Sequence, residues 1–454
     1  MFGPLLLPEL REMLEQRDTA GLREFLEALH PATSTEVLEN VSAADVWRVL
    51  ATAPFERQAE VFGYFQPAFQ TKLVENVERS HLSKLIETMA HDDRVDLLER
   101  MDPEHVEALL PLMAQAERND IRRLLSYPEG SAGSIMTTDY ASLPENITAG
   151  EALERLRRQA PDRETIYYVY ILDENRKLDG FITLRQLILA RPSSPLADIM
   201  ERDVFVVRVD DDQEKVAQEM AKFDFLAMPV VDNQHQLVGI ITHDDVLDVL
   251  QEEAAEDAYH MAAMAPMEEN YLEAPFSTVW RKRALWLSCL FLAELFTFTA
   301  LASFQDEIAA VIALSLFVPL CISTGGNSGS QAATLITRAM ALGQIRPGEW
   351  FRVVRHEIFM GFALGATLGL IGFLRAIVTP ESVIGTTDRW RLGLVIGQSV
   401  ALICLWGTLI GSMLPLLFRR MGLDPGYASS PFVATFVDVT GIVIYFSIAK
   451  LYLL

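Results

Sequence analysis

Cysteine is scarce in this chain of 454 residues, which contains only Cys289, Cys321 and Cys404. All three lie in apolar runs, so their number and spacing exclude both a disulfide framework and a zinc site. The sequence also lacks a Walker motif and a recognisable pairing of a nucleophile with a base. We therefore expect a protein that is not an enzyme.

Basic residues are few as well: 38 Lys and Arg stand against 62 Asp and Glu, for a net charge of −24. From residue 281 onward there are nine acids and thirteen bases, a balance of +4, so residues 1–280 carry −28. Such an acidic surface argues against nucleic acid as a partner and favours cations. The start of the chain shows no small-residue cleavage pattern, and we expect no signal peptide.

Residues 1–130 show apolar side chains at helical spacing, interrupted by prolines that end short helices. This pattern predicts a superhelical domain of short helices. Within it, Asp92 and Asp96 lie one turn apart, where two carboxylates repel unless a cation or a partner surface offsets them. A solvated helix face remains the alternative.

Residues 131–198 and 199–252 repeat one pattern: a β-branched run, a turn, a second run ending in Gly-Phe-Ile-Thr or Gly-Ile-Ile-Thr, and a helix. This order resembles a pair of α/β CBS domains. Paired CBS domains often bind adenine nucleotides in the cleft between them, so the resemblance implies possible ATP contacts at Tyr168, Thr183, Arg185 and Asp244. Gln186 departs from the acid that often follows this Arg.

Acids are concentrated where the second CBS repeat leads toward the apolar half, with nineteen acids and four bases in residues 201–280. Asp245, Asp248, Glu252 and Glu256 share one face of a predicted helix, where they repel one another. Hard oxygen ligands select Mg²⁺ or Ca²⁺ over softer metals, and no EF-hand loop is present. The pattern indicates a cation-binding segment, with solvated acids as the alternative.

Five apolar runs, at about 284–304, 308–325, 358–378, 392–418 and 431–454, are predicted to cross a membrane as helices. Basic residues gather on alternate sides of these runs, which places residues 1–280 in the cytoplasm and the C-terminus outside. The stretch STGGNSGSQ, residues 323–331, is so rich in glycine that we expect irregular backbone there, lining a cavity or packed on protein.

One carboxylate, Asp438, lies near the middle of the last apolar run. A charged residue at that depth usually faces a bundle interior or a water-filled path. Ala434 and Gly441 share its helix face and leave room beside it for a hydrated cation. A carboxylate that is hydrogen-bonded to neighbouring helices for structure alone is the alternative.

Taken together, PLCISTGGNSGSQAATL, PFVATFVDVTG, the CBS pair and the short-helix domain resemble the MgtE family of magnesium channels. GNSGSQ differs from the more usual GNTGNQ, and Ser430 stands where Asn is common. The resemblance implies a homodimer in the bacterial inner membrane, with five membrane helices per subunit (residues 276–454) and Asp438 and Ala434 at the pore. It also implies a plug helix at 253–275 that closes the pore when Mg²⁺ occupies sensing positions at Asp92, Asp96, Asp212, Glu214, Asp224, Asp245, Asp248, Glu253, Glu256, Asp257 and Asp424.

The sequence therefore predicts Mg²⁺ uptake through a channel that cytosolic Mg²⁺ closes. Three alternatives remain open: a broader divalent cation transporter, a carrier coupled to protons or sodium, and a nucleotide-sensing CBS protein that the membrane part only anchors. Asp438 is hard to explain in the last case, because anchoring needs no carboxylate in mid-membrane.

Overall fold

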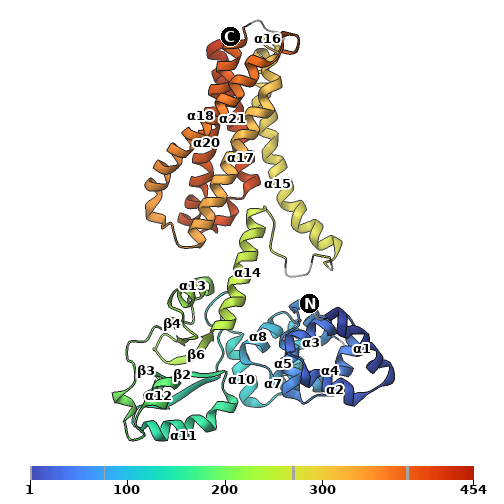
Figure 1. Ribbon diagram of the computed structural model, residues 1–454, viewed down its shortest axis with the longest axis vertical. Coiled ribbons are helices and arrows are strands. Elements are labelled where there is room, and N and C mark those ends of the chain that lie inside the picture. Colours follow the sequence, from blue (N-terminus) through green and yellow to red (C-terminus); the bar gives the residue numbers. More distant parts are fainter. Residues whose placement is uncertain (1–2, 76, 268–270, 273, 385–387, 454) are drawn as a thin grey trace. The chain divides into compact units, whose positions relative to one another are not determined.

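The computed structural model describes residues 3–75, 77–267, 271–272, 274–384 and 388–453 (Figure 1). These residues form two compact units, Met1–Glu253 and Ala254–Leu454. The first unit begins with short α-helices and one 3₁₀ helix, as predicted: α1 Gly3–Gln16, α2 Thr19–Ala28, α3 Pro31–Leu38, α4 Ala43–Leu50, α5 Phe55–Gly63, α6 Pro67–Val74, α7 Arg79–Thr88, α8 His91–Glu99, α9 Pro103–Leu109, η1 Leu110–Leu112 and α10 Gln115–Leu124.

Proline and polar caps set the ends of these helices. Pro31, Pro67 and Pro103 each occupy the first helical turn, where a missing N–H costs nothing. The apolar faces meet in one core, in which the indole of Trp47 donates a hydrogen bond of 2.9 Å to the carbonyl of Leu73. This core positions α8, which carries the acids of interest.

Two three-stranded sheets follow, in the orders β1-β2-β3 and β4-β5-β6. In each sheet the first pair is parallel and the second antiparallel. The predicted strand–turn–strand–helix repeat is therefore confirmed. Its elements are β1 Tyr140–Pro144, α11 Ala149–Gln159, η2 Ala160–Asp162, β2 Thr165–Leu172, β3 Leu178–Thr183, α12 Leu184–Leu189, η3 Leu196–Asp198, β4 Val207–Arg208, α13 Gln213–Phe223, β5 Ala227–Val231, β6 Leu237–Thr242 and α14 His243–Met261.

The helix expected at 253–275 differs from the prediction at both ends. It is the second part of α14, which starts at His243 directly after β6 and ends at Met261. Ala263, two residues later, has a φ of 56°, a left-handed conformation that an α-helix does not continue through. The expected range also includes residues 268–270 and 273, which lie outside the described residues.

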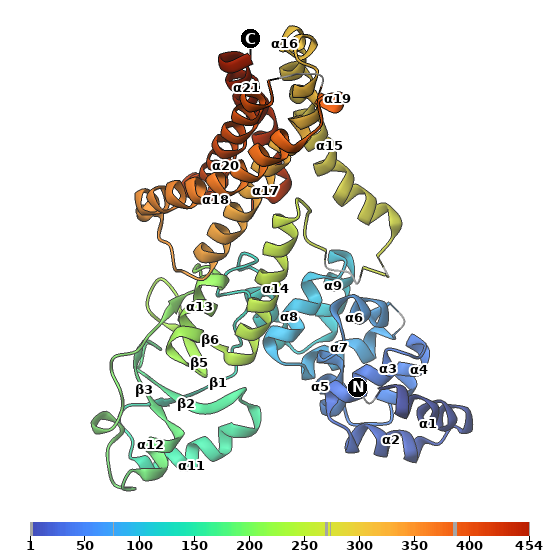
Figure 2. The ribbon, with the colours of Figure 1, turned by 45° about the horizontal axis from the view of Figure 1, so that its top comes forward.

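The second unit contains the apolar helices α15 Phe276–Ala302, α17 Ala313–Ala341, α18 Trp350–Val378, α20 Arg389–Arg420 and α21 Ser430–Leu453 (Figure 2). Short helices connect them: α16 Gln305–Ala310, η4 Pro347–Glu349, α19 Glu381–Ile384 and η5 Pro425–Tyr427. Within the described residues, α15, α18, α20 and α21 are long and apolar enough to cross a membrane. The remaining predicted span is α17, which has 29 residues but contains the polar stretch 323–331.

The prediction of irregular backbone at residues 323–331 is wrong, because α17 is helical through all of them. The glycines bring helices together instead of breaking one. A Cβ atom on Gly411 of α20 would lie 2.0 Å from the Gly329 carbonyl oxygen, and one on Gly407 would lie 2.4 Å from that of Gly325. Small residues let helix backbones touch in this way, and the packing offsets the poor helix propensity of glycine.

Candidate functional site

Asp438 lies on α21 and faces α17 across a glycine. A Cβ atom on Gly326 would lie 3.4 Å from both the Asp438 carboxylate oxygen and the Ala434 methyl group. Asp438 is half-buried. Among the described residues, none makes a hydrogen bond or an ion pair with this carboxylate, so the alternative of a structurally bonded acid finds no support. Gly326 is a neighbour that the sequence reasoning missed.

The helix opposite carries exposed polar side chains on one face. Ser323, Asn327, Gln331 and Thr334 follow at i, i+4, i+8 and i+11, and all four are exposed. The Asn327 amide and the Ser323 hydroxyl lie 3.4 Å apart. Such a face is costly against lipid, so it suits a water-filled path or a protein interface. The motif GNSGSQ contains Asn327 and Gln331, but the helical spacing that puts them on one face with Ser323 and Thr334 was missed because irregular backbone was expected there.

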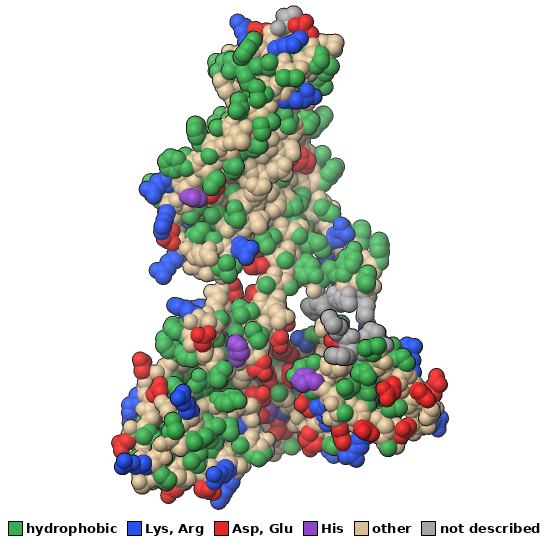
Figure 3. Space-filling model, viewed as in Figure 1, with side chains coloured by type: hydrophobic (Ala, Val, Ile, Leu, Met, Phe, Trp, Pro, Cys, Tyr) green, Lys and Arg blue, Asp and Glu red, His purple; other side chains and the backbone are tan. Residues whose placement is uncertain are grey.

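A second group of acids gathers in the first unit, where α8 meets the start of α14 (Figure 3). Desolvation, together with repulsion from Asp92, Asp96, Asp248 and Asp244, raises the pKa of Asp93 to about 7. Burial likewise raises the pKa of Asp96 to about 7, although Arg100, 3.8 Å away, acts against the shift. The structure thus brings the predicted acids of the helical domain and of the second CBS domain together.

Asp92 and Asp245 form the centre of this acidic cluster. Burial and the adjacent Asp92 carboxylate raise the pKa of Asp245 well above its ordinary value. Asp245 accepts hydrogen bonds from the Thr242 backbone N–H and hydroxyl, at 3.0 and 2.6 Å. One Asp92 oxygen is buried and has no hydrogen-bond partner among the residues that the structure describes. Glu164 also belongs here, since burial, Asp92 and Asp244 raise its pKa to about 7.

Asp93 and Glu164 were missed. Asp93 adjoins a predicted acid in the run HDDRVD, but helical periodicity did not connect it with the acids of α14. Glu164 precedes β2 and has no sequence pattern that connects it with α8.

Other predicted sensing residues do not join this group. Asp212 caps the N-terminus of α13 by accepting from the Lys215 N–H at 3.1 Å, and Asp224 ends the same helix with a φ of 55°. They therefore lie at opposite ends of an 11-residue helix. Glu214 accepts a hydrogen bond from Gln218, and Glu253 accepts one from Gln213. Among the described residues, no three His, Cys, Asp or Glu side chains are placed to hold one metal ion.

In the second unit, two predicted acids flank a histidine that the sequence reasoning did not select. The Nδ1 atom of His260 lies 2.5 Å from Asp424 Oδ2, and its Nε2 atom lies 3.7 Å from Glu256 Oε1. The imidazole is 6% exposed and packs on Tyr427, with ring centres 4.7 Å apart. Asp424 also accepts from the Gly426 N–H at 2.7 Å, so it has structural bonds of its own. Asp257 lies on the same helix, α14.

The residues predicted for nucleotide binding are only partly together. Tyr168 on β2 pairs with Thr183 on β3, and a small void of about 30 Å³ between the two CBS domains is lined by Tyr168 but not by the other three residues. Gln186 accepts from the Thr183 hydroxyl at 2.7 Å and completes a capping box on α12. Arg185 is exposed, and Asp244 accepts from Thr242 at 2.5 Å.

Comparison with known proteins finds a separate family for the helical domain, the CBS pair and the apolar helices. Residues 29–130 match the family described as the MgtE intracellular N domain, and residues 132–193 and 196–252 match CBS domains. Residues 318–448 match the family described as a divalent cation transporter.

Two curated relatives and two solved structures are closely similar. The magnesium transporter MgtE of Thermus thermophilus is 39% identical over 99% of this chain and 98% of its own length. The magnesium transporter MgtE of Enterococcus faecalis is 36% identical over 74% of this chain and 72% of its own length.

Among solved structures, the soluble part of a magnesium transporter is 33% identical, covers 56% of this chain and 100% of its own, and has a TM-score of 0.53. The cytosolic domain of the Mg²⁺ channel MgtE in complex with ATP is 39% identical, covers 54% of this chain and 99% of its own, and has a TM-score of 0.51. With a helical domain, a CBS pair and apolar helices that all match in the same order, this chain belongs to the MgtE family of magnesium transporters.

Proposed function

We propose that this chain is the subunit of a homodimeric, Mg²⁺-selective channel that admits magnesium across the bacterial inner membrane and is closed by cytosolic Mg²⁺. The observation that carries the proposal is Asp438, a carboxylate in a membrane-spanning helix without a hydrogen-bond or ion-pair partner among the described residues. An ionisable side chain at that depth needs a partner or water. A permeating cation with its hydration shell supplies both.

The surroundings of Asp438 suit a hydrated ion. Mg²⁺ gives up its water reluctantly and is usually held through one or two carboxylates and several waters. Gly326 and Ala434 leave space beside the carboxylate for those waters. The polar face of α17 is exposed on the single chain. Two chains that face each other along α17 and α21 would enclose it and place two carboxylates around one path.

The test is Mg²⁺ flux into proteoliposomes in which pH and Na⁺ are equal on both sides. The wild-type channel should pass Mg²⁺ down its gradient at a rate that does not depend on pH or Na⁺ gradients. In a carrier coupled to protons or sodium, the Mg²⁺ flux should instead change when a gradient of the coupling ion is imposed. Asp438→Ala should abolish the flux, and Glu349→Gln, which changes an exposed acid at the end of η4, should leave it unchanged. Near-normal flux through well-folded Asp438→Ala would refute the pore assignment.

The acidic cluster of the first unit supports the proposed gate. Desolvation and repulsion from their shared neighbour Asp92 raise the pKa of Asp93, Asp96 and Asp245, so the arrangement of these carboxylates is unfavourable as long as they are charged and unbridged. Divalent ions that bridge them through water would reverse this repulsion. The first residues of α14 belong to the cluster, and the chain continues from α14 to the membrane helix α15. Mg²⁺ bound at the cluster would therefore favour one arrangement of the segment that leads into the membrane.

ATP is proposed as a second, regulatory ligand of the CBS pair. The support is the similarity to the MgtE cytosolic domain solved in complex with ATP, together with the position of Tyr168 at the void between the CBS domains. The base of the nucleotide would stack on Tyr168, and the exposed Arg185 would meet the phosphates.

A further inference from the structure

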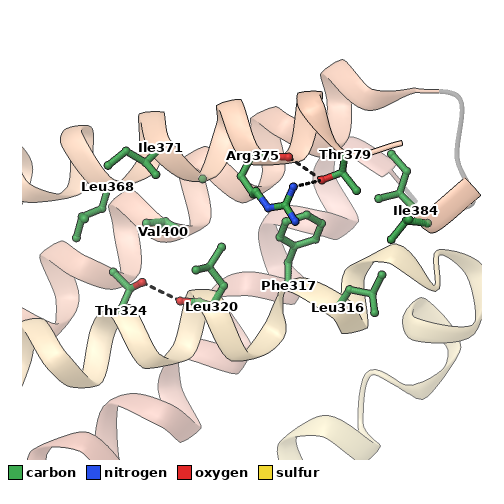
Figure 4. Close-up of a pocket in the computed structure, with 12 residues that line it drawn as sticks. Leu316, Phe317, Leu320, Thr324, Leu368, Ile371, Arg375, Thr379, Ile384 and Val400 are labelled. Carbon is green, nitrogen blue, oxygen red and sulfur yellow. Dashed lines mark hydrogen bonds between the residues drawn. The ribbon is translucent and has the colours of Figure 1, made fainter. Parts of the chain in front are cut away.

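The second unit also contains a groove with largely apolar walls. It has a volume of about 590 Å³ and runs between α17, α18 and α19 (Figure 4). Its walls are apolar and largely exposed, and neither Asp438 nor Ala434 lines it: Leu316 is 54% exposed, Leu320 44% and Ile371 59%. On α18, Leu368, Ile371 and Arg375 follow at i, i+3 and i+7, so one helix face carries both the apolar wall and a cation.

Arg375 is the charged residue of this groove. It lies at the end closed by Val383 and Ile384, and Figure 4 shows its side chain beside Phe317. Its Nη1 atom donates to the Thr379 hydroxyl at 3.3 Å, and that hydroxyl in turn donates to the Arg375 carbonyl at 2.7 Å. Within the described part of the chain, no carboxylate lies within ion-pair distance of this guanidinium.

Three other basic residues at the same end of the helices form ion pairs. Arg389 pairs with Glu381 at 3.4 Å, Arg391 with Asp388 at 3.1 Å, and Lys450 with Glu307 at 3.2 Å. Glu381, Asp388 and Glu307 thus have basic partners, whereas Asp306 of α16 is exposed. Arg375 differs from the other cations here in having only a neutral hydroxyl beside it.

We propose that this groove binds one anionic phospholipid, with an acyl chain against the apolar walls and the phosphate on Arg375. A guanidinium binds a phosphate through two parallel hydrogen bonds, which a neutral threonine cannot replace. The groove lies between membrane-spanning helices and its apolar side chains are exposed on the single chain, so an acyl chain can reach them. The second copy of this chain is the competing occupant. A second copy would have to bring a carboxylate to Arg375, and three acids at this end, Glu381, Asp388 and Glu307, are already paired within their own chain.

Lipid retention on the purified full-length protein tests the proposal. Native mass spectrometry in detergent would compare phosphatidylglycerol with phosphatidylcholine of the same acyl chains. Arg375→Gln should weaken phosphatidylglycerol binding about tenfold, the loss expected for a hydrogen bond to a charged group, and leave phosphatidylcholine binding unchanged. Arg391→Gln removes an equal charge at the same end of the helices and should bind as the wild type does.

A second variant tests the acyl chain. Leu320→Trp, which fills the groove from an exposed position, should lower the retention of both lipids without lowering the melting temperature. Unchanged phosphatidylglycerol binding by Arg375→Gln would overturn the headgroup assignment, as would its displacement by millimolar inorganic phosphate. If Leu320→Trp instead changes the oligomeric state and keeps its lipid, the groove is an interface between two copies and the proposal is wrong.

Discussion

The Ser330 hydroxyl on α17 donates a hydrogen bond of 3.1 Å to the carbonyl of Ser430 at the start of α21. These are two positions at which the chain departs from the more usual family motifs, and the structure places them in contact. The bond ties the polar helix α17 to the helix that carries Asp438.

Ser330→Ala should remove this bond and leave the Ser430 carbonyl without it. A typical hydrogen bond contributes about 1 kcal/mol, so the melting temperature in detergent should fall by a few degrees. Mg²⁺ flux should persist, because the hydroxyl does not contact Asp438. Ser315→Ala is the control: its hydroxyl bonds only to Ile312, within a single turn. Equal effects of the two changes would contradict a role in joining α17 to α21.

Gly411→Leu should separate α17 from α20. The close approach of the Gly411 Cα to the Gly329 carbonyl leaves no room for even a methyl group, so the two helices must move apart. Overpacking in a core typically costs about 1–3 kcal/mol, and here backbone is the obstacle, so the upper part of that range is expected. Thermal unfolding measures it. Gly348→Ala, whose added methyl group would meet no atom within 4 Å, should leave the melting temperature unchanged.

The acidic cluster predicts a dependence of stability on pH. The pKa of both Asp93 and Asp96 is raised from 3.8 to about 7, so the folded protein holds protons that the unfolded chain releases. Stability from these groups therefore falls as the pH rises from about 4 to about 7, and the loss is complete above that window. In EDTA, the melting temperature should be higher at pH 6 than at pH 8.

Addition of Mg²⁺ at pH 8 should restore the melting temperature, and Asp93→Asn should reduce the pH dependence. Glu154→Gln, an exposed acid paired with Arg157 on α11, should change neither. A melting temperature that is independent of both pH and Mg²⁺ would rule out bridging of the cluster by divalent ions.

Neutralising one acid of the cluster together with Glu256, farther along α14, should also weaken closure of the channel by Mg²⁺. Asp245→Asn with Glu256→Gln should leave conduction intact and raise the Mg²⁺ concentration needed for closure, because fewer carboxylates bind the closing ions. Moving a gate from 1:99 to 99:1 requires about 5.5 kcal/mol, which several weak ions share. Flux should be measured beside limited proteolysis of residues 253–275. Normal closure by the double variant, with cleavage indifferent to Mg²⁺, would disprove this gate.

ATP should bind the full-length protein with an affinity that depends on Tyr168. Loss of stacking in Tyr168→Ala should weaken binding by about fivefold to a hundredfold, given the 1–3 kcal/mol typical of an aromatic side chain against a base. Isothermal titration with the purified protein measures this, and Tyr167→Ala, an exposed neighbour on β2, is the control. Absence of heat at millimolar ATP with the wild type would count against the nucleotide site.

Much of the architecture was predictable because it depends on local periodicity. The short helices of residues 1–130, the doubled strand–turn–strand–helix unit and the long apolar runs each repeat a pattern within a few residues. Asp438 could be selected in the same way, because a single acid in an apolar run is visible without any neighbour. The acids of α8 and α14 were also selected, because each group shows helical spacing and the resemblance implied that both bind Mg²⁺.

The errors came from residues whose role depends on a partner far along the chain. Gly325 and Gly329 have the composition of a loop, and only their contact with Gly407 and Gly411 of α20 shows that they hold two helices together. The end of α14 at Met261 was missed because the range 253–275 rested on the family resemblance and not on a local signal for the end of the helix.

The sequence by itself determined that the chain has an acidic part and an apolar part, that the apolar part spans a membrane, and that one carboxylate lies within it. Composition and spacing suffice for these conclusions, because burial in lipid and helix periodicity act on each segment separately. The tertiary structure decided which acids share an environment, which glycines meet a backbone and where Arg375 stands beside an apolar groove. Those relationships join residues from different helices, and only folding brings them within the few ångströms at which charge and packing act.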